Sequence, residues 1–121
     1  MKIKSLTQEF TVCKLEHPIN IDSLKGIYFI GQTDEETSLV CETKFAPSDT
    51  LQREDDWRGF RIEGTLDFSL VGILAKISAI LAANNIGIFA VSTYNTDYIL
   101  TKAENFPRAI AALRDAGYET E

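Results

Sequence analysis

The sequence predicts a mixed α+β fold in which two helices cover one face of a four-stranded antiparallel sheet. Two observations in the second half of the chain lead to this prediction. Short runs of β-forming residues are present, and stretches whose apolar residues recur at helical spacing separate them. Their order is β-α-β-β-α-β over about 60 residues. Because crossover connections within one sheet are right-handed, this order is typical of a ferredoxin-like plait.

The first strand and helix of this half follow each other directly. The strand is RGFRIEG, residues 58–64, in which Phe60 and Ile62 share one face. Asp67 or Ser69 could cap the start of the helix, since both side chains can accept hydrogen bonds from free N–H groups. The helix shows apolar residues at i, i+3, i+4, i+7 and i+11, namely Leu70, Ile73, Leu74, Ile77 and Leu81. Its end is predicted at Asn84 and Asn85, before Gly87.

Three strands and a second helix complete this half. IGIFAVS, residues 86–92, and DYILTK, residues 97–102, are the predicted strands. A helix is expected from Asn105 to Ala116, with Pro107 in its first turn and Gly117 behind it. Its core face consists of Phe106, Ile110 and Leu113, and the final strand is YET, residues 118–120.

The first half follows the same plan with less room for helices. Strands are predicted at QEFTVCKL (8–15), IYFIGQT (27–33) and SLVCETKF (38–45). The connection EHPINIDSLKG admits at most one helical turn, and the polar segment after Pro47 is the expected boundary, with a further turn of helix there. We therefore expect a degenerate half, residues 1–56, and a full domain, residues 57–121. A second half or a partner chain would cover the helix-free face of the sheet.

Composition excludes several classes of protein. The chain has 121 residues, 45% of them hydrophobic, and a net charge of −6 that repels phosphate backbones and anionic membranes. No run approaches the length of a membrane span, and MKIKSLTQEF lacks the apolar stretch of a secretory signal. Cys13 and Cys41 lie in strand-like runs and are expected to be buried, inert thiols. These features predict a cytoplasmic protein that binds neither nucleic acid nor membrane.

Catalytic motifs are missing from the sequence. His17 is the single histidine and is expected in a solvated loop, so neither a zinc cluster nor a Ser-His-Asp triad is predicted. GTLDFSLVG has neither of the phosphate-loop glycine spacings. RGFRI faintly resembles an RNA-binding signature, but it precedes the first long helix and the chain is acidic. We expect no enzyme, no cofactor and no metal.

Two polar turns remain as candidate functional elements: EGTLDFS, residues 63–69, and STYNTD, residues 92–97. Both have a structural interpretation, because Gly64 suits a tight turn, Asp67 a helix cap and STYNTD a hairpin. They also have a functional one. A helix N-terminus attracts a carboxylate, and Asp97 or Asp67 could take an ammonium group, so an amino acid would match both. The residues alone leave both interpretations open.

Residues 57–118 carry a resemblance to a known family, above all in EGTLDFSLVGIL and IFAVSTYNTDYIL. The chain resembles the ACT-domain family, and within it the small tandem-ACT regulators similar to aspartate kinase regulatory regions and to the CASTOR arginine sensors. The resemblance implies that the loop after the first strand holds the ligand's backbone. The implied ligand-binding residues are Gly64, Thr65, Leu66, Asp67, Val71 and Gly72, together with Ser92, Thr93, Tyr94, Asn95, Thr96 and Asp97.

The resemblance also implies a function. The chain is expected to be a regulatory module that binds an amino acid, forms a homodimer and signals through self-association or a separate protein partner. EHPINIDSLKG is unlike EGTLDFS, so a second equivalent site in the first half is not expected. The alternative is a structural dimerisation module that binds no ligand.

Overall fold

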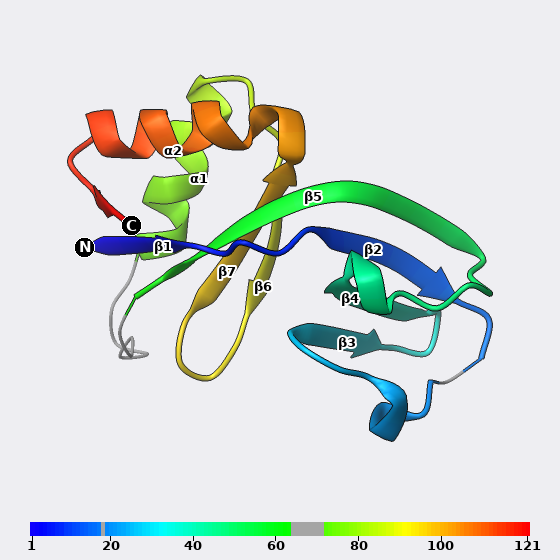
Figure 1. Ribbon diagram of the computed structural model, residues 1–121. Coiled ribbons are helices and arrows are strands. Elements are labelled where there is room, and N and C mark those ends of the chain that lie inside the picture. Colours follow the sequence, from blue (N-terminus) through cyan, green and yellow to red (C-terminus); the bar gives the residue numbers. More distant parts are fainter. Residues whose placement is uncertain (18, 64–71) are drawn as a thin grey trace. The chain divides into compact units, whose positions relative to one another are not determined.

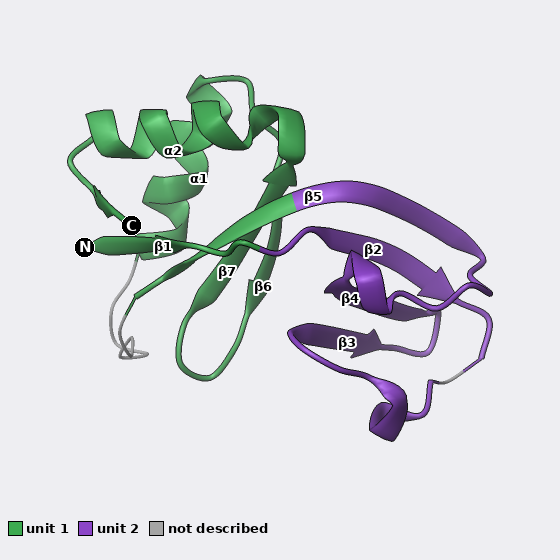
Figure 2. Ribbon diagram, viewed as in Figure 1, with its two compact units in different colours: residues 1–7, 58–121 green, residues 8–57 purple. Residues whose placement is uncertain are grey.

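The computed structural model describes residues 1–17, 19–63 and 72–121 (Figure 1). The described chain forms two compact units, residues 8–57 and residues 1–7 with 58–121 (Figure 2). The strands are β1 (Lys2–Ser5), β2 (Phe10–Leu15), β3 (Tyr28–Gln32), β4 (Thr37–Glu42), β5 (Gln52–Ile62), β6 (Phe89–Ser92), β7 (Asp97–Lys102) and β8 (Glu119–Thr120). The helices are α1 (Ile73–Ala83) and α2 (Phe106–Asp115), with single 3₁₀ turns at Ile21–Ser23, Thr43–Phe45 and Ala103–Asn105.

The larger unit is a plait with one additional strand. Its strands lie in the order β6-β7-β5-β1-β8. β1 pairs antiparallel with the last part of β5 and parallel with β8. The predicted ferredoxin-like α+β fold is confirmed, including the pairing of the strand before α1 with β7. The inserted strand β1 was not predicted, because MKIKS is too short for its alternation to be recognised.

Both helices of this unit cover the same face of its sheet. Phe60 and Ile62 of β5 point toward them, as the alternation predicted. One buried cluster joins sheet and helices and contains Ile3, Phe60, Ile62, Ile77, Leu81, Ile86, Ile99, Phe106, Ala109 and Leu113. None of the described helices is long and apolar enough to cross a membrane. The burial of these ten apolar residues between the sheet and the helices stabilises this unit.

The helix ends agree in part with the prediction. α1 ends at Ala83, with Asn84 as its C-cap residue and a φ of +58° at Asn85, and α2 starts at Phe106, next to Pro107. At its start α1 has Gly72 as the N-cap residue, with a φ of +81° and no side-chain cap. The predicted caps Asp67 and Ser69 lie outside the described residues, as does Leu70.

The smaller unit has the strand order β3-β4-β2-β5, which is the order of a plait without an extra strand. All its strand pairs are antiparallel. Cys13, Leu15, Leu39 and Cys41 form its buried cluster, so the predicted burial of both free thiols is confirmed. Short 3₁₀ turns occupy the positions of the two helices, since the connections hold too few residues for more.

The two units repeat the same element plan. β4 and the 3₁₀ turn Thr43–Phe45 are matched sixty residues later by β7 and the 3₁₀ turn Ala103–Asn105. The connection from β2 to β3 runs from Leu15 to Tyr28, whereas the matching one runs from Ile62 to Phe89 and contains α1. This agrees with the expectation of a first half in which the helices are shortened.

One prediction at the junction is wrong. A turn of helix was expected in the polar segment after Pro47, but Gln52–Asp56 of this segment belongs to the strand β5. It pairs with β2, and its charged side chains are mostly exposed, so the strand lacks the apolar alternation that would have identified it. The domain division 1–56 and 57–121 remains a proposal. The compact units separate between Trp57 and Arg58, and residues 1–7 belong to the larger one.

Candidate functional site

STYNTD forms the hairpin that connects β6 and β7, and most of its polar groups bond to one another. Ser92 and Asp97 are directly opposite, and the loop is closed by Thr93 N–H donating to the Thr96 carbonyl at 2.8 Å. The Thr93 hydroxyl donates to the same carbonyl at 3.0 Å and accepts from Thr96 N–H at 3.4 Å. The hairpin interpretation of this stretch is therefore confirmed.

The corresponding hairpin of the smaller unit has the same design. Thr33 N–H donates to the Glu36 carbonyl at 2.9 Å, and the Thr33 hydroxyl accepts from Glu36 N–H at 3.2 Å. The threonine at this position thus closes both loops. A structural role accounts for Thr93 without any ligand.

The remaining polar groups of STYNTD differ in their accessibility. The Ser92 hydroxyl donates to Asp97 Oδ1 at 2.5 Å, which orients the half-buried carboxylate. Tyr94 is 79% exposed, and Asn95 is exposed beside it. Ser92 and Thr93 are exposed as well, so a ligand could reach every member of the hairpin except the buried Thr96.

Thr96 connects the hairpin to the end of β5. Its hydroxyl donates to the Ile62 carbonyl at 2.8 Å, and its side chain is buried, with 8% exposed. Ile62 precedes the predicted loop EGTLDFS by one residue. The structure therefore brings one predicted turn to the point where the other begins.

The other predicted site residues are only partly covered by the structure. Gly72 is exposed, and its carbonyl accepts from Lys76 N–H at 2.9 Å, in the first turn of α1. Gly64, Thr65, Leu66, Asp67 and Val71 lie outside the described residues. The ligand-binding role of all twelve residues remains a prediction.

A charged group next to the hairpin was missed by the sequence interpretation. Arg61 alternates with Phe60 and Ile62 and so lies on the helix-free face. Its guanidinium donates to Glu63 Oε2 at 3.2 Å. Hydrogen bonds with Tyr98 and with Glu63 raise the pKa of Arg61 above its ordinary value. The alternation of side chains along β5 was the signal that Arg61 lies on the helix-free face.

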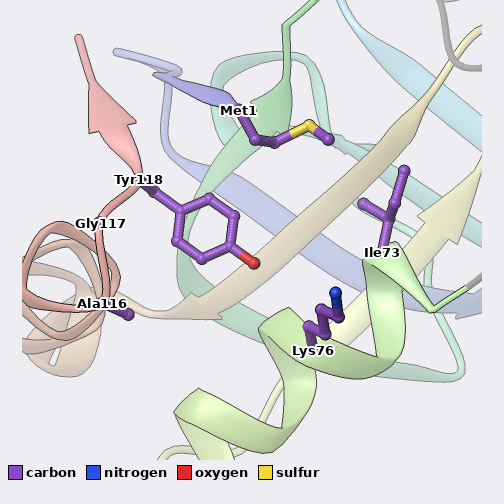
Figure 3. A pocket seen from close by; sticks show the side chains of 6 residues that line it. All are labelled: Met1, Ile73, Lys76, Ala116, Gly117 and Tyr118. Carbon is purple, nitrogen blue, oxygen red and sulfur yellow. The ribbon is translucent and has the colours of Figure 1, made fainter.

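Two of the cavities in the described structure lie away from the hairpin, one in each unit. The larger, of about 310 Å³, lies between α1 and the end of α2 (Figure 3). The second, of about 200 Å³, includes the exposed His17 and Asp49 in its lining. No group of three His, Cys, Asp or Glu side chains within residues 1–17, 19–63 and 72–121 could hold a metal ion.

Comparison with known structures places the chain among proteins of the same fold. The protein Atu0741 from Agobacterium tumefaciens is 28% identical, with a TM-score of 0.88 over 99% of this chain and 91% of that one. The regulatory subunit of aspartate kinase from Thermus thermophilus is 12% identical, with a TM-score of 0.69 over 97% of both chains. Aspartate kinase from Clostridium acetobutylicum is 16% identical, with a TM-score of 0.70 over 94% of this chain and 34% of that one. Comparison with curated protein sequences gives no match.

The fold defines a small α+β protein with a plait in each of its two units. The family follows from the sequence comparison, in which the ACT domain model matches residues 52–115, more than half of the 121 residues. The chain belongs to the ACT-domain family.

Proposed function

We propose that this protein is a regulatory module that binds an amino acid at the two polar turns of its larger unit. Membership of the ACT-domain family supports this proposal, as does the similarity in fold to the regulatory subunit of an aspartate kinase. The observation that carries it is the hydrogen bond from Thr96 to the Ile62 carbonyl. That bond holds STYNTD beside the start of EGTLDFS, so that groups from both turns could contact one small ligand.

The opposite charges of an amino acid match the groups in these turns. Free N–H groups at the start of α1, near Gly72, suit the carboxylate, and Asp97 suits the ammonium group. A helix N-terminus contributes about 0.3 to 1 kcal/mol per charge, whereas micromolar affinity requires about 8 kcal/mol. Further contacts are therefore needed. We assign them to Gly64, Thr65, Leu66, Asp67 and Val71 of the loop, with Tyr94 and Asn95 of the hairpin.

The proposed module is cytoplasmic, is not an enzyme and acts as a homodimer. Ligand binding would change self-association or the affinity for a separate protein partner. This mode of action follows from linkage, because a ligand that binds one association state more tightly shifts the population toward it.

A thermal-shift screen of the twenty protein amino acids tests the ligand site. At about 100 times its dissociation constant, a ligand stabilises the folded state by about 2.7 kcal/mol, which raises Tm by several degrees. We expect one amino acid or a few related ones to give this shift, and Asp97→Asn to abolish it. Asp115→Asn is the matched control, because Asp115 is an exposed aspartate on α2 outside both turns. An unchanged shift in Asp97→Asn would refute the proposed role of Asp97.

The alternative function is dimerisation without a ligand. It is favoured by the internal bonding of the hairpin, which explains Thr93 and Thr96 structurally. Light scattering distinguishes the two functions. A stable dimer that no amino acid changes, together with no thermal shift, would support the structural module.

A further inference from the structure

The cavity described above in the unit formed by residues 1–7 and 58–121 has the features of a binding site. It measures about 310 Å³, near the lower limit of about 300 Å³ for small-molecule sites. The first turn of α1 forms one side, and the turn after α2 forms the other (Figure 3). Its lining consists of Met1, Ile73, Lys76, Ala116, Gly117 and Tyr118. None of these residues belongs to the proposed amino-acid site.

The C-terminal end of α2 fixes the position of Tyr118, which lines the cavity. Gly117 N–H donates to the Arg114 carbonyl at 3.0 Å, and Tyr118 N–H donates to the Leu113 carbonyl at 3.1 Å. These two bonds define a Schellman motif, in which Gly117 adopts a φ of +100°. The Tyr118 ring packs against the core cluster. Its orientation is therefore set before any ligand arrives.

Lys76 supplies the positive charge of the cavity. Its side chain is exposed on the first turn of α1, and Figure 3 shows its ammonium group and the Tyr118 hydroxyl both directed into the space between the two elements. Among the described residues, none of those that line the cavity carries a carboxylate side chain. Lys2 Nζ and Glu121 Oε2 form an ion pair at 2.7 Å, and the Arg114 guanidinium donates a hydrogen bond to Thr120 Oγ1 at 2.8 Å.

The other described side chains of the lining are apolar. Ile73, Ala116 and the Met1 side chain offer only carbon and sulfur to a ligand, and Gly117 leaves space where a side chain would project. One ammonium and one hydroxyl can satisfy a single carboxylate. The oxygens of a phosphate beyond these two contacts would face apolar side chains and lack hydrogen-bond partners.

We propose that this cavity binds a small monocarboxylate with an apolar body, in which Lys76 and Tyr118 contact the carboxylate and Ile73 and Met1 contact the body. The site is separate from the proposed amino-acid site, and neither depends on the other.

Nuclear magnetic resonance titration of the full chain tests this proposal. The probes are hexanoate and phenylacetate, which combine a carboxylate with an apolar body. We expect saturable shifts at the Ile73 methyl groups and the Gly117 and Tyr118 amides. Hexanamide, acetate and inorganic phosphate each lack one required property and should shift these signals weakly or not at all.

Variants show whether the named groups make the contacts. Lys76→Gln should raise the dissociation constant for hexanoate about tenfold, and Tyr118→Phe should raise it a few-fold. Lys25→Gln removes the same charge from an exposed lysine that does not line the cavity and should leave it unchanged. Four results would each overturn the proposal: no saturable shift with either probe, shifts confined to residues 92–97, equal effects of the two lysine variants, or equal binding of phosphate. A shift caused by an amino acid at the hairpin alone would leave the proposed function standing.

Discussion

Thr96 shows how a single buried hydroxyl can position a turn. It is a small polar side chain in a hairpin, and it donates to a carbonyl at the end of a different strand, β5. Because Thr96 and Ile62 are both buried, water would not replace this donor at the carbonyl if the hydroxyl were removed. The contact therefore determines where the tip of the β6–β7 hairpin lies within its unit.

Thr96→Val should lower the free energy of unfolding by about 1 to 3 kcal/mol, because the Ile62 carbonyl would lose its donor while the side-chain volume stays similar. Urea denaturation followed by circular dichroism measures this change. Thr93→Val is the matched control, since Thr93 is exposed and water can replace its bonds. An equal loss in both variants would contradict the special role of Thr96.

Cys41 provides a second prediction at the scale of the residue. Burial, with a smaller contribution from the nearby Cys13, raises the pKa of the Cys41 thiol to about 11. Burial also raises the pKa of Cys13. Since the thiolate is the reactive form, about one Cys41 in a thousand is ionised at pH 8.

We therefore expect slow labelling of the native chain by a water-soluble disulfide reagent at pH 8. The rate should continue to rise as the pH increases toward 11, because the raised pKa moves the formation of the thiolate to higher pH. In urea, both thiols should react rapidly, which provides the internal control. Rapid stoichiometric labelling of the native protein would show that these thiols are accessible.

The polar residues of STYNTD could be interpreted only in part from the sequence. The excess of polar side chains was visible, but the pattern could not show that Thr93 bonds within the loop and Thr96 bonds across to β5. Those contacts join residues that are distant along the chain. Lys76 and Tyr118 were missed for the same reason, although Gly117 at the helix end indicated where the α2–β8 turn would lie.

At the scale of the element, α2 owes its stability to one apolar face. Phe106, Ala109 and Leu113 are buried, while Arg108 and Arg114 are exposed. The spacing of these residues fits a helix that covers a sheet. Isolated helices of this length are marginal in water, so packing of this face against the sheet holds the helix.

Leu113→Ala should lower the free energy of unfolding by about 2 to 5 kcal/mol, because it leaves a cavity between α2 and the sheet. Leu51→Ala is the control for the same change at an exposed position and should have little effect. Chemical denaturation of both variants gives the comparison. A small loss in Leu113→Ala would indicate that the core closes around the missing side chain.

Strand and helix patterns predicted the elements well where periodicity was strong. β7 was predicted with its observed bounds, and both helices were found, because their apolar residues repeat on one face. β1 and the first part of β5 were not identified. β1 has few residues, and the first part of β5 is mostly charged. Both are stabilised by pairing with strands that are distant in the sequence, not by the local β-propensity of their residues.

At the scale of the whole molecule, the two ends of the described chain meet in one unit. β1 lies between β5 and β8, and among the described residues β8 pairs with β1 alone. Ile3 of β1 is fully buried in the core of that unit. Residues 58–121 thus depend on a strand from the opposite end of the sequence.

A fragment of residues 57–121 should therefore fail to fold stably. It lacks Ile3 from the core, and β8 has lost its pairing strand. A matched chain in which a short Gly/Ser linker joins residues 1–7 to residues 58–121 should recover a cooperative thermal transition by circular dichroism. Leu6 N–H donates to the Gly59 carbonyl at 2.9 Å, so residues 7 and 58 lie close enough for a short linker to join them. Cooperative melting of the fragment without β1 would show that β1 is dispensable.

The position of β1 also has a kinetic consequence during protein synthesis. Lys2 pairs with Glu119, so β1 must wait for a strand that is made 117 residues later. Contacts this far apart in sequence slow folding, because loop closure must occur before they form. The smaller unit, residues 8–57, has no such delay, since its strands are all made before residue 58. Translation would then produce one folded unit while the edge of the other stays open until β8 has been made.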